Sequence, residues 1–421
     1  MVSSVREMKD SGIEWIGEIP EGWTVESSKG IFVARKERAR KDDVMLTASQ
    51  RFGMIPQERY DDVVSYKTVK VIKDEDILKH VESGDFVISM RSFQGGLEYS
   101  EYRGKMSSAY LALYPRQGWP IIDGYYKYLF KSHRYIQSLQ RTSNLVRDGQ
   151  ALRYANFIQV PIPYPPLDEQ RRIANYLGER CTVIDEVRST IEDQIEALRR
   201  LRKATIHRAV VTGLTDAPKV KLSHMAWVGS STRVFTNELV DSGIPFFRGT
   251  EIGAKAVGKF DTPSLYITNE HYERLVGQTG KVSVGDLLLP SICYEGQIWH
   301  VDNDEPFYFK DGRVLWIRPN HALAEGRFLR YALASELQLN YELYASGTTF
   351  AEMKIVTLKQ VPVPFASLSE QQRIADYLDE RCAAIDSVID TRTRQLERLD
   401  DYRRALIFAY VTGKKEVPTH A

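Results

Sequence analysis

The sequence predicts an α+β protein with two globular modules, each followed by a long helix. The two helices are expected to pack as an antiparallel coiled coil with pseudo-twofold symmetry. Three observations support this prediction: a long internal repeat, a proline-rich segment followed by a long apolar stripe in each copy, and short β-branched or aromatic runs elsewhere. With 421 residues, 43% of them hydrophobic, the chain is long enough to bury more than one core.

The internal repeat begins at Gln159 and again at Gln360. The first copy reads QVPIPYPPLDEQRRIANYLGERCTVIDEV and the second reads QVPVPFASLSEQQRIADYLDERCAAIDSV. Weaker echoes, SGDFVIS and VGDLLLP, keep nearly the same offset within the globular parts. So long a period indicates duplication of a whole domain with its connector. The expected parts are a first module at 1–158, a first helical region at 159–213, a second module at 214–359 and a second helical region at 360–421.

Each helical region is expected to hold one long helix. Proline disfavours helix in the residue before it, so residues 161–166 stay extended and the helix begins at Asp168. Apolar residues then recur at heptad spacing until Gly213, and the second copy ends at Gly413. A lone helix would expose this stripe, so the two helices should pack together. The stripe residues are Leu177, Ile184, Ile191 and Leu198 with Val187, Ile195 and Leu201, and in the second copy Leu378, Ile385, Leu399 and Leu406 with Val388 and Leu396.

Strands and helices alternate within the modules. The runs FVISM, MSSAYLALYP, LLLPSICY and RVLWIRP are bounded by Gly, Pro or Asp and predict strands. Residues 125–139 and 328–344 space their apolar side chains at three and four, which predicts one helix near the end of each module.

Several functional classes are excluded by composition and motif. The net charge is +1, so any basic surface must be local. No apolar run approaches the length of a membrane span and the first residues lack an apolar signal core, so a cytoplasmic protein with no membrane partner is expected. The three cysteines are too scattered for a disulfide framework, the histidines lack zinc-site spacing, and no phosphate-binding loop occurs. A methyltransferase cofactor loop and an Asx-Pro-Pro-aromatic motif are also missing. The chain is therefore expected to bind rather than catalyse, with no metal or cofactor of its own.

Two alternatives remain open. Glu352 and Lys354 form an ExK fragment that a metal nuclease would use, although a surface charge pair is the preferred interpretation. A coiled-coil interaction scaffold without DNA binding is favoured by the slight excess of acids in the second module.

Basic residues nevertheless gather locally in the first module, where residues 35–41 predict a phosphate-facing surface or, equally, a solvated face. The loop after each Gly-Asp strand, MRSFQGG and SICYEGQIWH, offers side chains that can hydrogen-bond base edges. The candidate DNA contacts are Arg35, Lys36, Arg91, Ser92, Gln94, Arg103, Lys105, Arg147, Gln150, Arg153, Arg248, Tyr294, Gln297, His300, Lys310, Arg313, Thr348 and Thr349.

The duplicated EQ.RIA.YL signature and the opening SGIEWIGEIPEGW resemble the specificity subunit of type I restriction-modification systems, over essentially the whole chain. The resemblance implies two target recognition domains that read the halves of a bipartite, asymmetric site in double-stranded DNA, with the helix pair as a ruler for the spacer. It also implies a non-catalytic subunit that carries two methyltransferase subunits, which use S-adenosylmethionine to methylate adenine N6, and restriction or motor subunits, which use ATP and magnesium.

The resemblance further implies that the signature residues lie where the methyltransferase subunits dock, with coiled-coil packing and capping as the competing role. These residues are Glu169, Gln170, Arg172, Ile173, Tyr176 and Leu177, with Glu370, Gln371, Arg373, Ile374, Tyr377 and Leu378. One departure concerns the second module, which opens with KLSHMAWVGS and keeps only a Trp-Val-Gly core of the first opening. Whether the two modules begin in the same way is therefore left open by the sequence.

Overall fold

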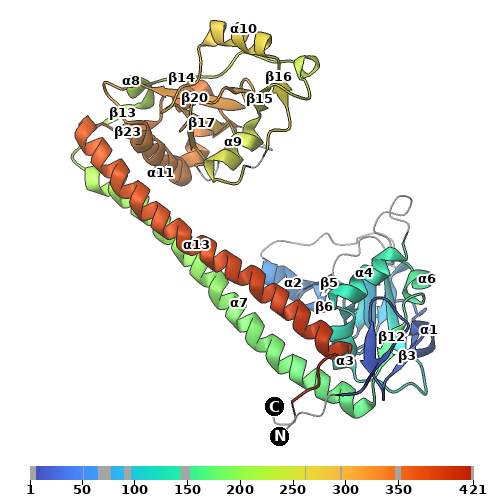
Figure 1. Ribbon diagram of the computed structural model, residues 1–421. Coiled ribbons are helices and arrows are strands. Elements are labelled where there is room, and N and C mark those ends of the chain that lie inside the picture. The colour runs from blue at the N-terminus through green and yellow to red at the C-terminus, as the bar shows by residue number, and fades with distance from the viewer. Residues whose placement is uncertain are drawn as a thin grey trace. The chain divides into compact units, whose positions relative to one another are not determined.

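The computed structural model describes residues 6–50, 52–64, 77–89, 96–143, 152–260, 262–293, 296–346 and 352–418. The chain divides into two compact units (Figure 1). Unit 1 comprises Met1–Ile191 with Arg394–Ala421, and unit 2 comprises Glu192–Thr393. Each unit therefore contains one globular part together with a segment of both long helices.

A four-stranded antiparallel sheet in the order β4-β11-β8-β9 organises unit 1. Its strands are β4 (Phe32–Ala34), β11 (Tyr110–Pro115), β8 (Phe86–Ser89) and β9 (Glu98–Tyr99). Phe32 and Phe86 are fully buried, with ring centroids 5.7 Å apart in an edge-to-face arrangement, and Phe130 lies 5.1 Å from Phe86. Such aromatic contacts give this sheet an interior of large rings.

Short elements surround the unit 1 sheet. They are β1 (Met8–Asp10), β2 (Glu18–Pro20), β3 (Thr24–Glu26), α1 (Ser28–Ile31), β5 (Leu46–Ser49), β6 (Gly53–Pro56), α2 (Gln57–Val64), β7 (Lys79–Val81), β10 (Gly104–Met106), α3 (Asp123–Leu129), α4 (His133–Arg141), α6 (Tyr154–Phe157) and β12 (Ile162–Tyr164). The pairs β1-β2, β5-β6, β7-β10 and β3-β12 are all antiparallel.

Unit 2 repeats the sheet order as β14-β20-β17-β18. The strands are β14 (Ala226–Gly229), β20 (Val314–Pro319), β17 (Leu287–Pro290) and β18 (Trp299–His300). A further sheet in the order β16-β15-β19 joins β15 to β16 antiparallel and to β19 in parallel. In unit 1 the hairpin β5-β6 meets β10 through one parallel bridge, Met45 with Lys105. The remaining elements are η2 (Thr212–Leu214), β13 (Lys219–Lys221), α8 (Leu222–Met225), η3 (Thr236–Glu238), β15 (Ile244–Phe247), α9 (Gly249–Ala256), β16 (Tyr266–Ile267), α10 (Asn269–Thr279), β19 (Tyr308–Phe309), α11 (Gly326–Tyr344), β21 (Ala345–Ser346), β22 (Glu352–Met353), α12 (Ile355–Leu358) and β23 (Pro362–Pro364).

The two long helices, α7 (Leu167–Val210) and α13 (Leu368–Val411), contain 44 residues each. In unit 1 the first part of α7 meets the last part of α13, where Arg188 donates to Asp400 at 3.3 Å. In unit 2 the last part of α7 meets the first part of α13, where Arg202 donates to Asp386 at 2.9 Å. Within each unit the helices therefore run antiparallel, as the sequence predicts. No helix in the described ranges is both long and apolar enough to cross a membrane.

The buried stripe of these helices is narrower than the sequence predicts. Leu177, Ile184 and Ile191 are buried, as expected from their heptad spacing. Val187 and Leu201, expected to widen the stripe, are 44% and 53% exposed, and Val388 of the second helix is 44% exposed. Two helices that contact only each other over this length bury a narrow seam, so positions beside the seam stay in solvent.

Both units use the same strand pair ahead of the sheet. β3 pairs with β12 in unit 1, and β13 pairs with β23 in unit 2, each followed by a one-turn helix and the edge strand of the sheet. The Trp-x-Gly motif that both modules contain, at Trp15 and at Trp227, does not occupy equivalent positions in the two units. Trp15 is buried and its Nε1 donates to Pro161 O at 3.1 Å, whereas Trp227 lies on β14 and is 49% exposed. Backbone pairing, not the tryptophan motif, makes the beginnings of the two sheets alike.

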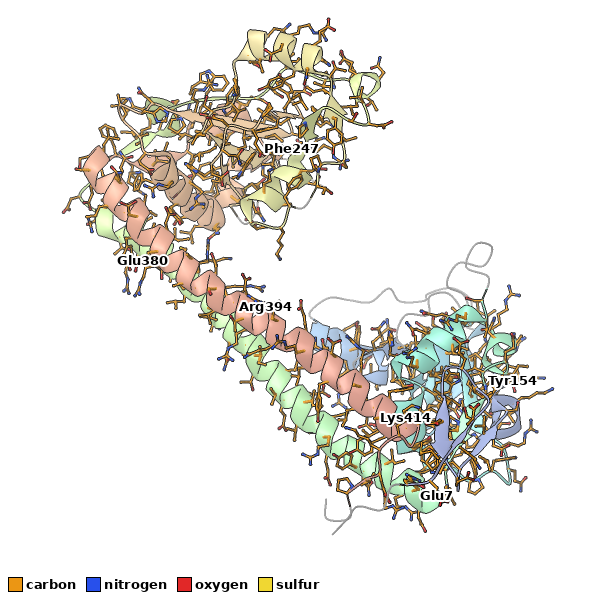
Figure 2. All side chains as sticks on the ribbon, viewed as in Figure 1. Glu7, Tyr154, Phe247, Glu380, Arg394 and Lys414 are labelled. Atoms are coloured by element: carbon orange, nitrogen blue, oxygen red, sulfur yellow. The ribbon has the colours of Figure 1, made fainter. Side chains whose placement is uncertain are left out.

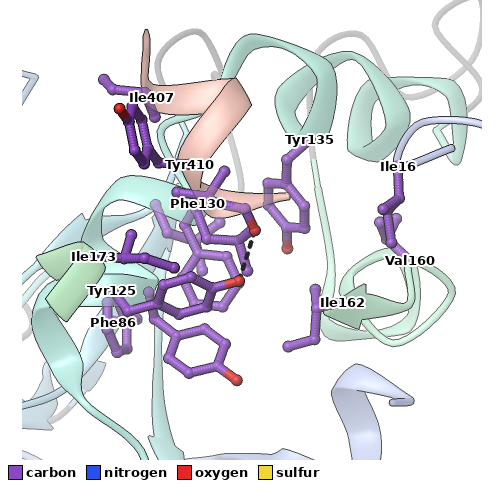
Figure 3. Close-up of a cluster of buried hydrophobic side chains, with 14 of the residues drawn as sticks. Ile16, Phe86, Tyr125, Phe130, Tyr135, Val160, Ile162, Ile173, Ile407 and Tyr410 are labelled. Atoms are coloured by element: carbon purple, nitrogen blue, oxygen red, sulfur yellow. Dashed lines mark hydrogen bonds between the residues drawn. The ribbon is translucent and has the colours of Figure 1, made fainter. Parts of the chain in front are cut away.

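The helix predicted at 125–139 is wrong as a single element, because α3 and α4 are separated at residues 130–132. Ser132 has an extended backbone and begins α4 as its N-cap residue. The helix predicted at 328–344 is α11, which begins at Gly326. Figure 3 shows that α3 brings Tyr125 into the buried cluster that also contains Ile173 and Tyr410 of the long helices. The predicted α+β class, with two globular parts that each precede a long helix, is confirmed.

Candidate nucleic-acid interface

Three of the predicted basic residues lie where the ends of β15 and β19 adjoin the start of β20 in unit 2. Lys310 follows β19, and its backbone N–H donates to Phe247 O at 2.9 Å. Arg313 precedes β20, and its carbonyl accepts from the N–H of Ser291 at 2.9 Å. Arg248 directly follows β15 and precedes α9. We call this region, with Arg248, Lys310 and Arg313, the unit 2 basic edge.

Two carboxylates orient the arginine heads of the basic edge. Glu251 accepts from Arg248 Nη2 at 2.5 Å, and Glu352 forms an ion pair with Arg313. Burial alone would raise the pKa of Glu251, but hydrogen bonds from Arg248 and Thr250 lower it to about 2. The two arginine side chains remain 48% and 55% exposed. Because a guanidinium has five N–H donors, each head keeps donors for a further acceptor.

The turn between β19 and β20 is braced by serine hydroxyls. Ser230 accepts from the N–H of Gly312 at 3.0 Å and donates to Val314 O at 2.7 Å. Ser231 donates to Phe309 O at 2.6 Å. Hydrogen bonds therefore fix the backbone from which Lys310 and Arg313 project. Recognition of bases or phosphates by a loop requires such a rigid backbone.

The ExK fragment belongs to the same edge. Glu352 lies on β22 and is paired with Arg313, and Lys354 precedes α12 as its N-cap residue. Within the described ranges, no group of three or more His, Cys, Asp or Glu side chains is arranged to hold a metal ion. A charge pair therefore accounts for Glu352 as the structure shows it.

At the corresponding end of the unit 1 sheet lies a lysine that the sequence did not single out. Ser89 at the end of β8 pairs with Tyr110 at the start of β11, and Lys79 Nζ donates to Tyr110 O at 2.7 Å. Burial lowers the pKa of Lys79. Lys79 reaches this position because β7 pairs with β10, with Lys79 opposite Met106. Since that pairing joins distant parts of the chain, no local pattern marks the residue.

Arg35 is held inside unit 1. Its Nε and Nη2 donate to the two carboxylate oxygens of Asp85 at 2.7 and 2.9 Å, and its Nη1 donates to Glu37 at 2.7 Å. The guanidinium also lies 4.7 Å from the ring centroid of Tyr114. These contacts, above all the Asp85 hydrogen bond, raise the pKa of Arg35. The neighbouring Lys36 is exposed.

Arg103 precedes β10, and Lys105 lies within it, opposite a buried histidine. Arg103 donates to Asp42 at 2.8 Å, and Lys105 lies opposite His80 of β7. His80 is fully buried, with Nδ1 2.6 Å from an Asp43 carboxylate oxygen. Arg103 is therefore paired with carboxylates, so this side of unit 1 carries both charges.

The other described candidates for DNA contact do not belong to the unit 2 basic edge. Arg153 is exposed and begins α6 as its N-cap residue. Gln297 is partly exposed in the loop before β18. His300 pairs with Leu287, at the opposite end of β17 from the basic edge, where burial and Arg330 lower its pKa. The structure therefore does not bring His300 together with the basic edge.

Eight candidates lie outside the described residues: Arg91, Ser92, Gln94, Arg147, Gln150, Tyr294, Thr348 and Thr349. The glycines that follow the two Gly-Asp loops are described, however. Gly96 has φ +86°, and a Cβ there would lie 2.2 Å from Phe130 O. Gly296 has φ +67°, and a Cβ there would lie 2.8 Å from Ala334 O. At both positions the left-handed φ and the close carbonyl oxygen leave room for glycine alone.

The signature residues of the long helices divide into a buried and an exposed set. The buried members are Gln170, Ile173, Tyr176, Leu177, Gln371, Ile374 and Leu378. The exposed members are Arg172, Arg373 and Tyr377, and Glu169 and Glu370 are intermediate. Glu169 accepts from Trp23 Nε1 at 2.7 Å, and Glu370 accepts from Arg373 Nη2 at 2.6 Å. The buried set serves packing within its own unit, and the exposed set is accessible on the chain alone.

Comparisons with known proteins agree with this doubled organisation. A model of the type I restriction modification DNA specificity domain matches residues 220–398. The putative type I restriction enzyme MjaX specificity subunit of Methanocaldococcus jannaschii is 24% identical over 440 residues, covering 96% of this chain and 96% of that protein. The type I restriction enzyme MjaVIII specificity subunit of the same organism is 25% identical, covering 95% and 94%.

A solved structure supports the fold. A chain from a study of complex assembly and conformational transition of the type I R-M system superposes with a TM-score of 0.69 at 17% identity. The match covers 94% of this chain and 99% of that chain. At this identity the match establishes the fold alone.

Proposed function

We propose, from the premise that this chain belongs to the specificity subunits of type I restriction-modification systems, that it is the subunit that recognises DNA sequence. The single observation that carries this proposal is the match to named specificity subunits over 96% of the chain, with both globular units included. The two alternatives, an interaction scaffold and an autonomous nuclease, have no such support.

Each unit reads one half of a bipartite site in double-stranded DNA. At the unit 2 basic edge, Lys310 supplies a point charge for phosphate, and Arg248 and Arg313 supply planar donor sets that suit guanine O6 and N7. The lysine contact is expected to add affinity for all sequences, whereas the arginine contacts discriminate between bases. In unit 1 the exposed Lys36 and the half-buried Lys79 are two of the described groups that can contact phosphate.

The long helices act as a ruler for the spacer between the half-sites. A helix of 44 residues is about 65 Å long at 1.5 Å per residue. Two methyltransferase subunits, and restriction or motor subunits beyond them, assemble on this framework, with Arg172, Arg373 and Tyr377 as accessible signature residues. S-adenosylmethionine, ATP and magnesium belong to those partners. This chain supplies recognition and spacing, not catalysis.

The test is to co-express the chain with a type I methyltransferase subunit in a host free of adenine methylation and to map N6-methyladenine across the genome. One bipartite motif with a fixed spacer is expected. A stable complex that leaves no sequence motif would overturn the proposal and favour a scaffold.

Two variants sharpen this test. Arg313→Ala is expected to relax one base of one half-site, at a cost of about 1–3 kcal/mol in discrimination. Lys310→Ala is expected to weaken binding to all sequences alike and to lower the salt dependence by about one charge. Lys219→Ala, an exposed lysine on β13 away from the basic edge, is the matched control. If Arg313→Ala and Lys310→Ala lower affinity in the same sequence-independent way, the assignment of Arg313 to base reading is wrong.

A further inference from the structure

Each long helix carries one fully buried glutamine near its first turn. Gln170 of α7 and Gln371 of α13 occupy the same place in the two copies of the repeat, and both have 0% exposure. A buried amide has one acceptor and two donor hydrogens, and leaving them unpaired costs free energy. The hydrogen-bond partners of these two side chains therefore show which segments of the chain they connect.

The Gln170 amide joins three segments of unit 1. Its Oε1 accepts from the backbone N–H of Ile122, the N-cap residue of α3, at 2.9 Å. Its Nε2 donates to Pro165 O, in the segment that leads into α7, at 2.8 Å. A single side chain thus ties the start of the long helix to the start of α3 and to the segment before the helix.

The Gln371 amide makes the same connection in unit 2. Its Oε1 accepts from the backbone N–H of Glu325, directly before α11, at 3.0 Å. Its Nε2 donates to Ala366 O at 2.8 Å and to Leu323 O at 2.9 Å. We call this arrangement the glutamine bridge. The second copy has one hydrogen bond more than the first.

From each bridge the contacts continue into the recognition sheet. In unit 1, Asp123 at the start of α3 accepts from the Tyr99 hydroxyl of β9 at 2.9 Å. In unit 2, a Cβ on Gly326 at the start of α11 would lie 3.2 Å from His300 Nε2 of β18. Tyr99 and His300 are equivalent, since they pair with Phe86 and Leu287 at the starts of β8 and β17. In both units the start of the helix therefore lies beside this strand residue, through a hydrogen bond in unit 1 and by close approach in unit 2.

The start of α3 is also pressed against the long helix. A Cβ on Gly124 would lie 3.0 Å from the Cβ of Ala174, and the Tyr125 hydroxyl donates to Val411 O at 2.6 Å. Little room is left for α3 to slide or rotate. A satisfied polar network in a dry site specifies one arrangement more sharply than apolar packing does.

We propose that Gln170 and Gln371 are positioning residues that fix the angle between each recognition sheet and its long helix, and so fix the one spacer length that the protein accepts. The proposal rests on the proposed function. A strand of four residues spans about 13 Å, so a rotation of about 5° at the bridge moves groups at the far end of the sheet by about 1 Å. That displacement is large for hydrogen bonds to base edges.

The experiment uses Gln170→Met and Gln371→Met in the full chain, co-expressed with the methyltransferase subunit and analysed by genome-wide N6-methyladenine mapping. Methionine keeps the length of the side chain and removes both hydrogen-bonding groups. Each variant is expected to keep the bases of both half-sites and to methylate sites whose spacer is one base pair shorter or longer at least tenfold more than the unchanged chain. Gln371→Met should show the larger rise, because it loses three hydrogen bonds.

The matched controls are Gln159→Met and Gln360→Met. Both glutamines are exposed and occupy equivalent positions in the repeat, eleven residues before the bridge glutamines. They are expected to leave the spacer unchanged. A merely structural role would lower methylation at the original spacer alone, so an unchanged spacer in the bridge variants overturns the proposal.

A second pair of variants guards against loss of folding. Gln170→Glu and Gln371→Glu keep the acceptor oxygen and lose the amide donors, and they are expected to relax the spacer if the methionine variants do not assemble. If no bridge variant assembles while both controls do, the glutamines are folding elements and the proposal fails. Failure of the proposed function is distinct, because the unchanged chain would then give no bipartite motif.

Discussion

Units 1 and 2 share a framework and differ in what surrounds it. Both have the same sheet order, the same strand pair ahead of the sheet and the same glutamine bridge. Around the sheet, unit 1 has the hairpin β5-β6 and the pair β7-β10, whereas unit 2 has the sheet β16-β15-β19 with α9 and α10. The parts common to both units connect the sheet to the long helix, and the parts that differ surround the surface proposed to read DNA.

The interiors differ at one equivalent position. Glu98 pairs with Val87 in unit 1, and Trp299 pairs with Leu288 in unit 2. Glu98 forms a buried ion pair with Lys131, and burial raises the pKa of the carboxyl and lowers that of the amine. Trp299 instead packs with Phe247, labelled in Figure 2, and Lys255 Nζ lies 4.6 Å from its ring centroid. The same strand position therefore holds a charged side chain in unit 1 and an aromatic side chain in unit 2.

The largest expected effect comes from removing one partner of the Glu98–Lys131 ion pair. Lys131→Met leaves the Glu98 carboxylate buried without its partner, which is expected to lower the free energy of unfolding by about 3–5 kcal/mol. Chemical denaturation of the purified chain measures the change. The double variant Glu98→Leu with Lys131→Met should recover most of the loss, because an apolar pair needs no compensation. A double variant as unstable as the single one would contradict this interpretation.

The next effect concerns the hydroxyl that joins α3 to the end of α13. Tyr125 donates to Val411 O, whereas Phe328 of α11 is packed against Val210 at the end of α7. Tyr125→Phe is expected to cost about 1–2 kcal/mol, because it removes a buried hydrogen bond and leaves a carbonyl unpaired. Leu139→Ile, a volume-conserving change in the same core, provides a reference for packing effects. Equal stability of Tyr125→Phe and the unchanged chain would show that the hydroxyl is dispensable.

A smaller effect depends on pH. Burial raises the pKa of Asp286 in unit 2, although Ser283 and Trp316 donate to its carboxylate. The folded state thus holds the proton more tightly than the unfolded state. The contribution of Asp286 to stability is therefore greatest below its ordinary pKa, about 3.9, and is lost as pH rises through the raised pKa. Denaturation of the Asp286→Asn variant from pH 4 to 7 should follow a flatter curve than the unchanged chain, and parallel curves would contradict the assignment.

The smallest effect is expected on the helix pair. Arg202 and Asp386 are 34% and 47% exposed, so solvent screens their ion pair. A double-mutant cycle with Arg202→Ala and Asp386→Ala should give a coupling of about 0.2–1 kcal/mol that decreases with salt. The Arg188–Asp400 pair of unit 1, at 3.3 Å, should give no more. A coupling well above this range would mean that charge, not the buried seam, sets the helix register.

Features that arise from local periodicity could be predicted from the amino-acid sequence. The heptad spacing and the proline-rich segments located both long helices to within a few residues, because helix formation and termination depend on neighbours in the chain. The repeat predicted two similar units, and the four β-branched or aromatic runs located β8, β11, β17 and β20. The buried Leu177 and Leu378 were likewise readable from spacing alone.

Contacts between distant segments could not be predicted in this way. The lysine at Tyr110 and the gathering of Arg248, Lys310 and Arg313 depend on strand pairs that are distant in sequence. The same holds for Gln170 and Gln371, which the sequence marked as partner contacts or caps and which the fold buries against backbone groups 48 and 46 residues away. A hydrogen-bond partner supplied from another segment leaves no local pattern, because only folding brings the two groups within reach.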